Sequence, residues 1–322
     1  MLSHSIYIFT AYIIDRIVGD PRALPHPVVL MGKCISLLEK VIRKFVVKEK
    51  ALKLAGLLFP ILIAGGTYGI VALLLYTISL VNHWLAVIAE IWLISTTVAT
   101  KGLGDAGMEV YRHLKNNDLS KARQSLGMIV GRDTEELDEG EISRGAVETV
   151  AENIVDAIIS PFCYALIGGA PLAMAYRAVN TLDSMIGYKN EKYQNLGWAS
   201  ARFDDLLNYV PARLTALFML LACWVKRLDV RNAWAMIKRD AKRHPSPNSG
   251  IPEAATAGAL AIQLGGTNFY NGVASHRAKM GEPNRLIESD DIIRTIEVMR
   301  TTSMICVLLF FTISLLVAYY IS

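Results

Sequence analysis

The fold is decided by residues 54–89, LAGLLFPILIAGGTYGIVALLLYTISLVNHWLAVIA, a stretch in which no side chain carries a formal charge. It is too long for a single bilayer span, which needs about 20 apolar residues. Asn82 and His83 mark a turn near its end. The stretch therefore predicts a helix over 54–81, a tight turn and a second helix over 84–100. Glu90 falls inside the second helix, and we expect it to face protein because a carboxylate in lipid is costly.

Two further spans are predicted near the chain ends. Residues 302–321 carry no charge, and residues 1–18 form a shorter apolar run. Two internal segments are ambiguous. Glycines and prolines interrupt 157–176, and the uncharged part of 211–225 reaches only roughly 18 Å as a helix, against a hydrocarbon core of about 30 Å. We predict that both are partly embedded, because irregular backbone at that depth must be covered by protein or line a wet cavity.

Basic loops set the predicted orientation. Lysines and arginines gather in 40–53 and 226–243, and such loops remain on the cytoplasmic side. We therefore place the polar segments 19–53, 101–156 and 226–301 in the cytoplasm. Because residues 226–243 must lie in the cytoplasm, the two ambiguous segments are linked: either both cross the membrane or neither does. Four spans are predicted, and six spans are the alternative.

The composition agrees with this class. Of the 322 residues, 53% are hydrophobic, and the mean hydropathy is positive, whereas a soluble domain has nearer 45–50% apolar residues. The net charge of +4 is too small to indicate nucleic-acid binding, and we find no motif for it. No strand-type alternation is sustained. The prediction is an all-α, multi-pass integral membrane protein, a single domain over 1–322 with partly membrane-embedded catalytic helices.

An acidic stripe is the first segment that could carry chemistry. Glu148, Glu152 and Asp156 recur every four residues in ISRGAVETVAENIVD, so on a continuous helix they share one face. Such carboxylates suit Mg²⁺, which binds one or two of them together with phosphate and water. A solvated acidic face is the alternative. Because the stripe runs into apolar sequence, we predict that it binds metal.

A second segment, Gly131-Arg132-Asp133-Thr134, has two interpretations. Asp133 can cap a helix in a capping box with Glu136. Arg132 could then meet a phosphate at that helix N-terminus.

Residues 176–213 concentrate ionisable groups between two apolar segments. Such groups at membrane depth are costly and usually mark a site. The alternative is a set of ion pairs, for example Arg177 with Asp183 and Asp205 with Arg213. Residues six apart on a helix point about 120° apart. We therefore predict that Asn180 links its neighbours, rather than a simple salt bridge between Arg177 and Asp183.

The loop HPSPNSG at 244–250 precedes a helix that starts near Pro252, a residue favoured at the first helical position. The loop is neither a Walker A motif nor a dinucleotide fingerprint. A cap-and-turn role is the alternative to a binding role for this loop.

Together these segments resemble the CobD/CbiB family of cobalamin biosynthesis, the adenosylcobinamide-phosphate synthases. The matching stretches follow the family's order from Gly19 to Gly266, and no motif is missing. They are GDPRALPHPVVLMG, VGRDTEEL, ISRGAVETVAENIVDAIISPF, GGAPLAMAYRAVNTLDSMIGYKNEKY, GWASARFDDLLNYVPARL and HPSPNSGIPEAATAGALAIQLGG.

The resemblance implies an ATP- and Mg²⁺-dependent ligase. Such an enzyme joins a propionate carboxyl of adenosylcobyric acid to 1-amino-2-propanol or its O-phosphate, and yields adenosylcobinamide or its phosphate. The implied partners are the corrinoid, the aminopropanol, ATP, the lipid bilayer and other membrane enzymes of late cobalamin synthesis. The implied location is the cell (inner) membrane, with the active site facing the cytoplasm.

The motifs supply candidates for each role that this chemistry needs. Phosphoryl transfer needs Mg²⁺ and arginine, and an amine nucleophile needs a base. The predicted metal ligands are Glu148, Glu152 and Asp156. The predicted catalytic residues are Asp183, Asp204, Asp205 and His244, with Asp183 also assigned to Mg²⁺-ATP. The predicted substrate- and phosphate-binding residues are Arg132, Arg177, Asn180, Arg213, Ser246 and Asn248.

Two other classes of membrane protein remain as alternatives. An intramembrane Mg²⁺-dependent prenyltransferase also uses acidic clusters on helices, but its longer Asn-Asp-x-x-Asp pattern is absent. A transporter with broken helices around a midplane site is disfavoured because the polar residues lie at span ends and in loops, and we find no inverted repeat.

The orientation can be tested with fusion reporters. A reporter at about residue 240 is expected to be cytoplasmic because the surrounding loop is basic. A periplasmic result there would overturn the orientation. A second reporter near Lys189 separates four spans, which place it in the cytoplasm, from six.

Overall fold

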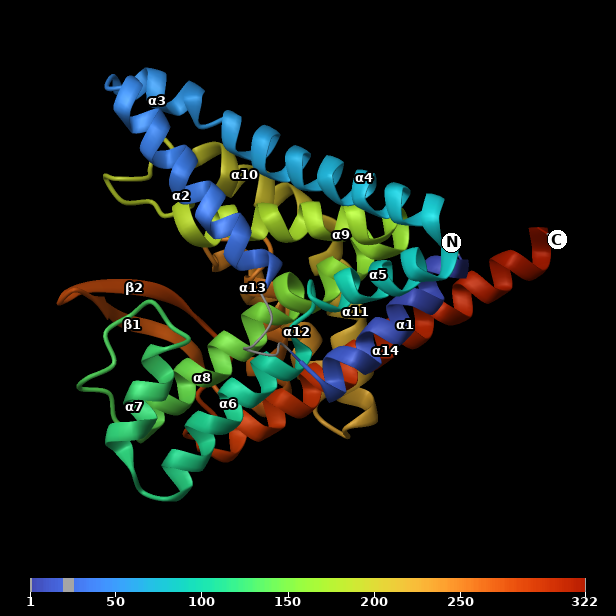
Figure 1. Ribbon diagram of the computed structural model, residues 1–322. Helices are drawn as coiled ribbons and strands as arrows, with labels where there is room; N and C mark the ends of the chain where they lie inside the picture. The colour runs from blue at the N-terminus through green and yellow to red at the C-terminus, as the bar shows by residue number, and fades with distance from the viewer. Residues whose placement is uncertain (1, 20–25, 322) are drawn as a thin grey trace. The chain divides into compact units, whose positions relative to one another are not determined.

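The computed structural model describes residues 2–19 and 26–321, and Figure 1 shows their helices and strands. Most of the motif GDPRALP therefore lies outside the described residues. The chain forms two compact units. Unit 1 comprises residues 1–99, 160–208 and 307–322, and unit 2 comprises residues 100–159 and 209–306.

Unit 1 is built from helices. They are α1 (Leu2–Ile17), α2 (Pro27–Phe45), α3 (Glu49–Ala55), the π-helical η1 (Pro60–Gly65), α4 (Gly66–Val81), α5 (His83–Ser95), α9 (Ser160–Ile186), α10 (Trp198–Leu207) and the second half of α14 (Asp290–Ile321). Helix α9 packs against α1, α2, α4, α5 and α10, so it is the centre of this unit.

Unit 2 contains the remaining helices and the only strands in the described residues. Its elements are α6 (Thr100–Lys115), α7 (Leu119–Gly127), α8 (Glu139–Ile154), the π-helical η2 (Val155–Ile159), α11 (Tyr209–Val225), α12 (Val230–Asp240), the 3₁₀ turn η3 (Ala241–Arg243), α13 (Gly250–Leu260), β1 (Leu264–Tyr270), β2 (Val273–Met280) and the first half of α14. Helix α13 is buried along its whole length and packs against α8, α11 and α12.

The helices confirm the predicted fold class of a multi-pass helical membrane protein. Four helical stretches are long and apolar enough to cross a membrane: Glu49–Val81, His83–Lys115, Glu139–Ile186 and Asp290–Ile321. The pair α10 and α11, bent by 43°, could form a fifth. Helix α1 has 16 residues, fewer than the about 20 that a span needs. The number of crossings and their orientation remain predictions.

The turn predicted at Asn82 and His83 is present. Asn82 is extended and ends α4, and its Oδ1 accepts hydrogen bonds from the N–H groups of Trp84 at 2.8 Å and Leu85 at 3.2 Å. This is an N-cap that satisfies backbone donors at the start of α5.

A break inside α9 explains the interrupted segment 157–176. Gly168 and Gly169 leave helical geometry, and Gly169 has φ 62°, a conformation that favours glycine. Two side chains satisfy the freed backbone. Glu90 accepts a hydrogen bond from the Ala170 N–H at 3.3 Å, and His4 lies 3.1 Å from the Leu166 carbonyl oxygen. The prediction that Glu90 faces protein is therefore confirmed.

The hairpin of β1 and β2 corrects the prediction that no strand is present. The strands pair antiparallel, and Asn271 and Gly272 connect them with φ values of 50° and 77°. Positive φ at both residues defines a type I′ turn, for which Asn-Gly is the preferred sequence. The Asn-Gly dipeptide was the sequence signal for this hairpin. The segments on either side of it alternate too irregularly between apolar and polar residues to be recognised as strands.

The hairpin also corrects the capping box proposed for Asp133. Its carboxylate accepts hydrogen bonds from the turn N–H groups of Asn271 at 3.0 Å and Gly272 at 2.7 Å. Helix α8 begins later, and Asp138 caps it by accepting from the Glu141 N–H at 2.8 Å. Asp133 thus holds the tip of a hairpin that is distant in sequence, which local spacing could not reveal.

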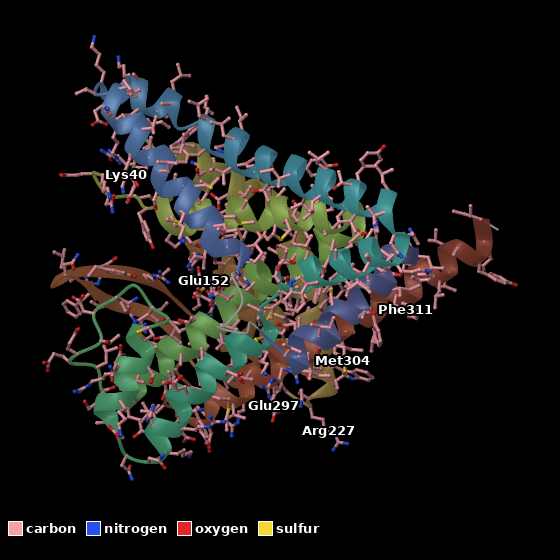
Figure 2. The ribbon with its side chains drawn as sticks, viewed as in Figure 1. Lys40, Glu152, Arg227, Glu297, Met304 and Phe311 are labelled. Carbon is pink, nitrogen blue, oxygen red and sulfur yellow. The ribbon has the colours of Figure 1, made fainter. Side chains whose placement is uncertain are left out.

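The charged side chains differ in how far they are buried. In Figure 2, Lys40 projects from α2 and Arg227 from the turn after α11, and both are exposed, whereas Glu152 lies among neighbouring elements and is half-buried. Charged groups that are withdrawn from water in this way need partners, because an unpaired buried charge is costly.

The packing of Gly197 generates a stability prediction. A Cβ at Gly197 would overlap the Ile186 carbonyl oxygen, which is backbone and cannot rotate away. Gly197→Ala should therefore lower the free energy of unfolding by about 1–3 kcal/mol or more, measured by thermal unfolding in detergent. Gly102→Ala in α6 is the control, because a Cβ there meets nothing within 4 Å. Equal melting temperatures for the two variants would contradict the prediction.

Candidate functional site

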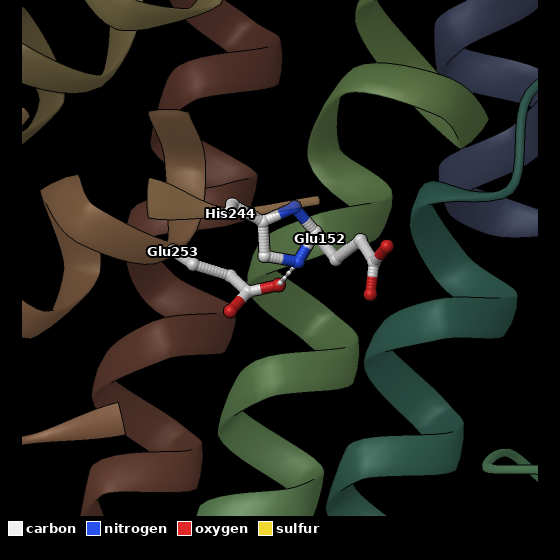
Figure 3. Close-up of side chains that lie close together, drawn as sticks. All are labelled: Glu152, His244 and Glu253. Atoms are coloured by element: carbon white, nitrogen blue, oxygen red, sulfur yellow. Dashed lines mark ion pairs between the residues drawn. The ribbon is translucent and has the colours of Figure 1, made fainter. Parts of the chain in front are cut away.

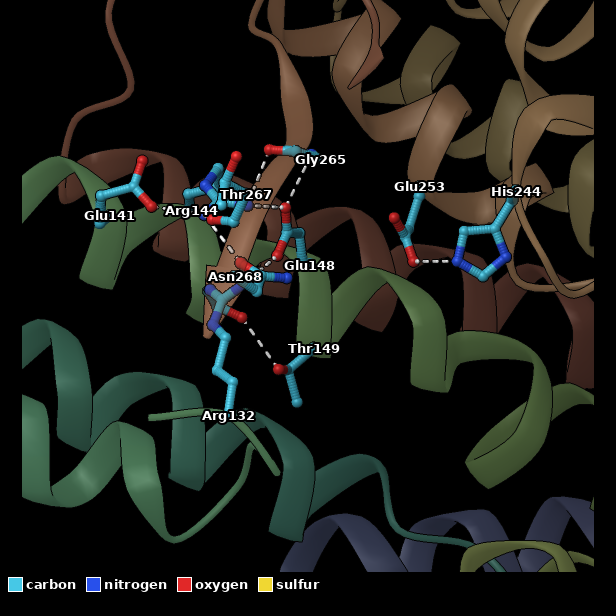
Figure 4. A network of polar contacts seen from close by, with 11 residues as sticks. Arg132, Glu141, Arg144, Glu148, Thr149, His244, Glu253, Gly265, Thr267 and Asn268 are labelled. Atoms are coloured by element: carbon cyan, nitrogen blue, oxygen red, sulfur yellow. Dashed lines mark hydrogen bonds and ion pairs between the residues drawn. The ribbon is translucent and has the colours of Figure 1, made fainter. Parts of the chain in front are cut away.

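A buried glutamate and two arginines organise unit 2 (Figure 4). Glu148 on α8 accepts hydrogen bonds from Arg132 at 2.9 Å, from Arg144 at 2.9 Å and from the Gly265 N–H at 2.8 Å. All three side chains are at least nine-tenths buried. Asn268 on β1 joins them, since its Oδ1 accepts from Arg132 at 2.5 Å and from Arg144 at 3.0 Å. This network fixes the first strand of the hairpin to α8.

The network tests the prediction that Glu148, Glu152 and Asp156 form one metal-binding stripe. Both Glu148 oxygens already accept hydrogen bonds from arginines, so the geometry gives no support to Glu148 as a metal ligand, nor to a solvated face at this position. Asp156 lies in the π-helical segment η2. A π-helical turn breaks the regular four-residue spacing on which the stripe rested. Of the three predicted ligands, only Glu152 joins a group of potential metal ligands among the described residues.

A polar cavity of about 140 Å³ lies beside this network. Arg132, Glu152, Asn153, Asn268 and Arg277 are among its lining residues. The Nε and Nη2 atoms of Arg132 are buried and have no hydrogen-bond partner among the described residues. Buried donors without partners are rare in folded proteins. Arg132 thus brings to the cavity wall a guanidinium whose hydrogen-bonding capacity is not fully used, a group that suits an anion such as phosphate.

Arg277 on β2 adds a second cation to this cavity. Its side chain is partly withdrawn from water, which disfavours the charged form, but Glu152, Tyr270, Glu253 and Glu148 together outweigh this effect, so the pKa of Arg277 is raised. Arg277 therefore stays charged. It was absent from the predicted site because nothing in its local sequence distinguishes it from the other basic residues.

Glu152 also belongs to a cluster of three potential metal ligands (Figure 3). One ligand atom each of Glu152, His244 and Glu253 lies within 4.8 Å of the others. His244 Nε2 and Glu253 Oε1 are 3.5 Å apart. Burial lowers the pKa of His244, and burial together with the charges of Glu152 and Glu148 raises the pKa of Glu253 well above its ordinary value.

Three separate segments position this cluster. Glu152 comes from α8, one turn after Glu148. His244 follows the 3₁₀ turn η3, and its ring is held by the backbone of Ser246. Glu253 is in the first turn of the buried helix α13. The sequence analysis missed Glu253. The sequence signal that could have identified Glu253 is that it is the single carboxylate in a helix made mostly of small and apolar residues.

The remaining predicted residues of unit 2 support the loop 244–250. Arg213 stacks on the Tyr209 ring, 3.6 Å from its centroid, and donates to Asn248 Oδ1 at 2.8 Å. The Ser246 hydroxyl accepts from the N–H groups of Asn248 and Ser249 at 3.3 and 3.4 Å. The cap-and-turn interpretation of this loop is therefore correct for Ser246, and the loop at the same time presents His244.

The predicted residues of unit 1 form a separate polar group. Arg177 donates to Asn180 Oδ1 at 3.1 Å, as the predicted link requires. Asp204 is buried, its Oδ2 accepts from Asn208 at 2.9 Å, and Asn180 also acts on its carboxylate. The charges of Asp183 and Asp205 act on it. Several carboxylates thus lie close to one another within this unit. Their assignment as catalytic residues remains a prediction.

These features define a class: a multi-pass helical membrane protein with a polar site that combines buried arginines, carboxylates and a histidine. The chain belongs to the CobD/CbiB family, since the family model described as CobD/Cbib protein matches residues 8–299.

Curated relatives support this membership. A cobalamin biosynthesis protein CobD of Halalkalibacterium halodurans is 49% identical over 304 residues, which cover 93% of each chain. A CobD of Geobacter metallireducens is 47% identical over 302 residues, 94% of each chain. A cobalamin biosynthesis protein CbiB of Salmonella typhimurium is 45% identical over 293 residues, 91% of this chain and 92% of the relative. No solved structure matches the chain.

The buried network generates a second stability prediction. Glu148→Gln removes the carboxylate that pairs with both Arg132 and Arg144 and leaves Arg144 only its ion pair with Glu141. Breaking a buried charge network in this way costs about 3–5 kcal/mol. Its melting temperature in detergent should fall far more than that of the control Glu139→Gln. Glu139 is an exposed residue in the first turn of the same helix, where the loss of a charge costs at most about 1 kcal/mol. Similar melting temperatures would show that the network does not stabilise unit 2.

Proposed function

We propose that the protein is an ATP-dependent amide ligase of cobalamin biosynthesis. It would join a propionate carboxyl of adenosylcobyric acid to 1-amino-2-propanol or its O-phosphate and release adenosylcobinamide or its phosphate. The observation that carries the proposal is the polar cavity of unit 2, which Arg132, Arg277 and Glu152 line. Glu152 also belongs to the adjoining cluster with His244 and Glu253. Membership of a family whose relatives are named cobalamin biosynthesis proteins supports the choice of pathway.

The reaction explains why such a cavity is needed. A carboxylate is a poor acyl donor, so one of its oxygens first attacks the terminal phosphorus of ATP, and ADP leaves. The amine nitrogen then attacks the acyl carbon, phosphate leaves, and the nitrogen loses a proton to a base. The phosphoryl step depends mainly on positioning and on cations that stabilise the developing charge. The amide step depends on a well-placed base.

The residues of unit 2 fit these demands. The unused donors of Arg132 and the charged Arg277 would bind phosphate oxygens. Mg²⁺ would accompany the nucleotide and neutralise its charge, and the Glu152 carboxylate at the cavity wall is suited to hold it. The His244 ring has a lowered pKa because it is buried, so near neutral pH it is uncharged and able to accept a proton.

The other predicted residues keep their proposed roles. Asp183, Asp204 and Asp205 remain candidate bases or Mg²⁺-ATP ligands in unit 1, together with Arg177 and Asn180 as substrate-binding groups. In unit 2, Arg213, Ser246 and Asn248 would position the loop that carries His244 and bind substrate through it. We place the protein in the cell membrane with this site facing the cytoplasm, where ATP is available. The corrinoid, the aminopropanol and other membrane enzymes of late cobalamin synthesis would be its partners.

A direct assay tests the proposal. The purified protein is incubated in lipid vesicles with adenosylcobyric acid, aminopropanol phosphate and MgATP, and the amide product and ADP are both quantified. Equal amounts of product and ADP are expected. Amide formation without ATP consumption, or ATP hydrolysis unaffected by the corrinoid, would contradict the ligase. A lack of any ATP dependence would favour a prenyltransferase or a transporter.

The role of Arg277 gives a sharper prediction. Arg277→Gln should lower kcat/KM for ATP by about 10- to 150-fold, because a hydrogen bond to a charged group contributes about 1.5–3 kcal/mol. Lys279→Gln, an exposed basic residue on the same strand, is the matched control and should leave kcat/KM unchanged. Parallel losses in both variants would point to a general loss of positive charge on the hairpin rather than a phosphate contact.

A further inference from the structure

The cluster of Glu152, His244 and Glu253 differs from the arginine-lined part of the cavity in both geometry and donor type. Its three side chains come from α8, from the loop after η3 and from α13, and they bring one ligand atom each to within 4.8 Å of the others inside unit 2. We propose that these three residues form a resident metal centre for a first-row transition ion of the Zn²⁺ and Co²⁺ type, distinct from the Mg²⁺ that accompanies a nucleotide. This inference does not depend on the ligase reaction proposed above, but it assigns Glu152 and His244 to the ion in place of the Mg²⁺ and base roles given to them there, and so leaves the carboxylates of unit 1 as the candidate bases.

The distances suit a metal of that size. Bonds from Zn²⁺ to histidine nitrogen and carboxylate oxygen are about 2.0–2.2 Å long, so two ligand atoms of a tetrahedral site lie roughly 3.4 Å apart. The separation of His244 Nε2 and Glu253 Oε1 is 3.5 Å, which is too long for a good hydrogen bond. Both atoms can therefore bind one ion without a large movement of either side chain.

Within the described part of the chain, Glu253 Oε1 and His244 Nε2 are buried atoms without a hydrogen bond, and the exposed fractions of the two side chains are only 1% and 6%. A buried carboxylate oxygen and a buried ring nitrogen that face each other unsatisfied are costly. A cation between them would satisfy both, and the two carboxylates would neutralise its double charge.

The backbone of Ser246 holds the far side of the His244 ring. The Nδ1 atom accepts a hydrogen bond from the Ser246 N–H at 3.1 Å and also lies 3.3 Å from the Ser246 carbonyl oxygen. A metal on Nε2 would move the ring proton to Nδ1, whose partner would then be that carbonyl oxygen instead of the N–H. An outer hydrogen bond of this kind fixes the tautomer and the ring orientation in most histidine metal sites. The prolines on either side of Ser246 stiffen the loop that supplies it.

The donor set selects the class of ion. Mg²⁺ prefers oxygen ligands and keeps several waters, whereas imidazole favours zinc and its first-row neighbours. Three protein ligands with a fourth position open are typical of catalytic rather than structural zinc sites. Glu152 belongs both to this cluster and to the wall of the polar cavity, so the ion would adjoin the cavity.

The competing explanation is a buried His–Glu pair whose charge is balanced by Arg277, which acts electrostatically on Glu152 and Glu253. The two explanations differ in metal content.

The full-length protein, purified in detergent and stripped with EDTA, is titrated with ZnCl₂ or CoCl₂ in the presence of excess MgCl₂, and bound metal is measured by mass spectrometry. One equivalent of Zn²⁺ or Co²⁺ per chain is expected to remain bound, and bound Co²⁺ should show visible absorption bands of a low-coordinate site.

Variants locate the ion. Glu253→Gln and His244→Gln should each weaken Zn²⁺ binding at least tenfold and remove the Co²⁺ absorption bands. Glu288→Gln and His276→Gln change exposed residues of the same types in the same unit and should bind like the parent protein. Should a cluster variant fail to fold, judged by size-exclusion chromatography, the parent protein alone decides. Failure of the parent to retain Zn²⁺ or Co²⁺ against MgCl₂, or retention that both cluster variants share, would overturn the proposal.

Discussion

The hydrogen-bonded ion cluster of Glu148 with Arg132 and Arg144 is the interaction on which unit 2 depends. Three charged groups are withdrawn from water, and each is stabilised by the others, by Asn268 and by the Gly265 backbone, with Glu141 as a further partner of Arg144. The contacts reach from α8 to the loop at 131–134 and to β1, so they set where the hairpin lies on the helix. That placement in turn brings Arg277 to the cavity wall.

The same rule governs the break in α9 within unit 1. A helix interrupted by two glycines exposes backbone groups that lipid cannot hydrogen-bond. Glu90 from α5 and His4 from α1 supply the missing partners, so polar residues in two apolar helices have a structural role. An ionisable residue in a membrane helix is therefore not always reactive. The groups around it determine whether its role is structural or chemical.

Neighbouring carboxylates on α8 illustrate this point. Glu148 and Glu152 are one turn apart and identical in local pattern, yet Glu148 is bound by arginines whereas Glu152 lines the polar cavity beside His244 and Glu253. Helical spacing correctly indicated that the two could share a face. It could not separate a structural anchor from a candidate ligand, because that difference depends on the side chains that approach from the loop at 131–134, the hairpin and α13.

Sequence alone was enough to predict the helical membrane class, the turn at Asn82, the inward-facing Glu90 and the contact of Arg177 with Asn180. Each follows from hydropathy or from spacing within one segment, where chain geometry fixes the distances. The folded structure was needed to show that Asp133 binds the hairpin turn, that Arg277 and Arg132 line one cavity, and that Glu253 lies near Glu152 and His244. These residues are far apart in sequence, and their separation in space depends on how helices and strands pack, which no local pattern records.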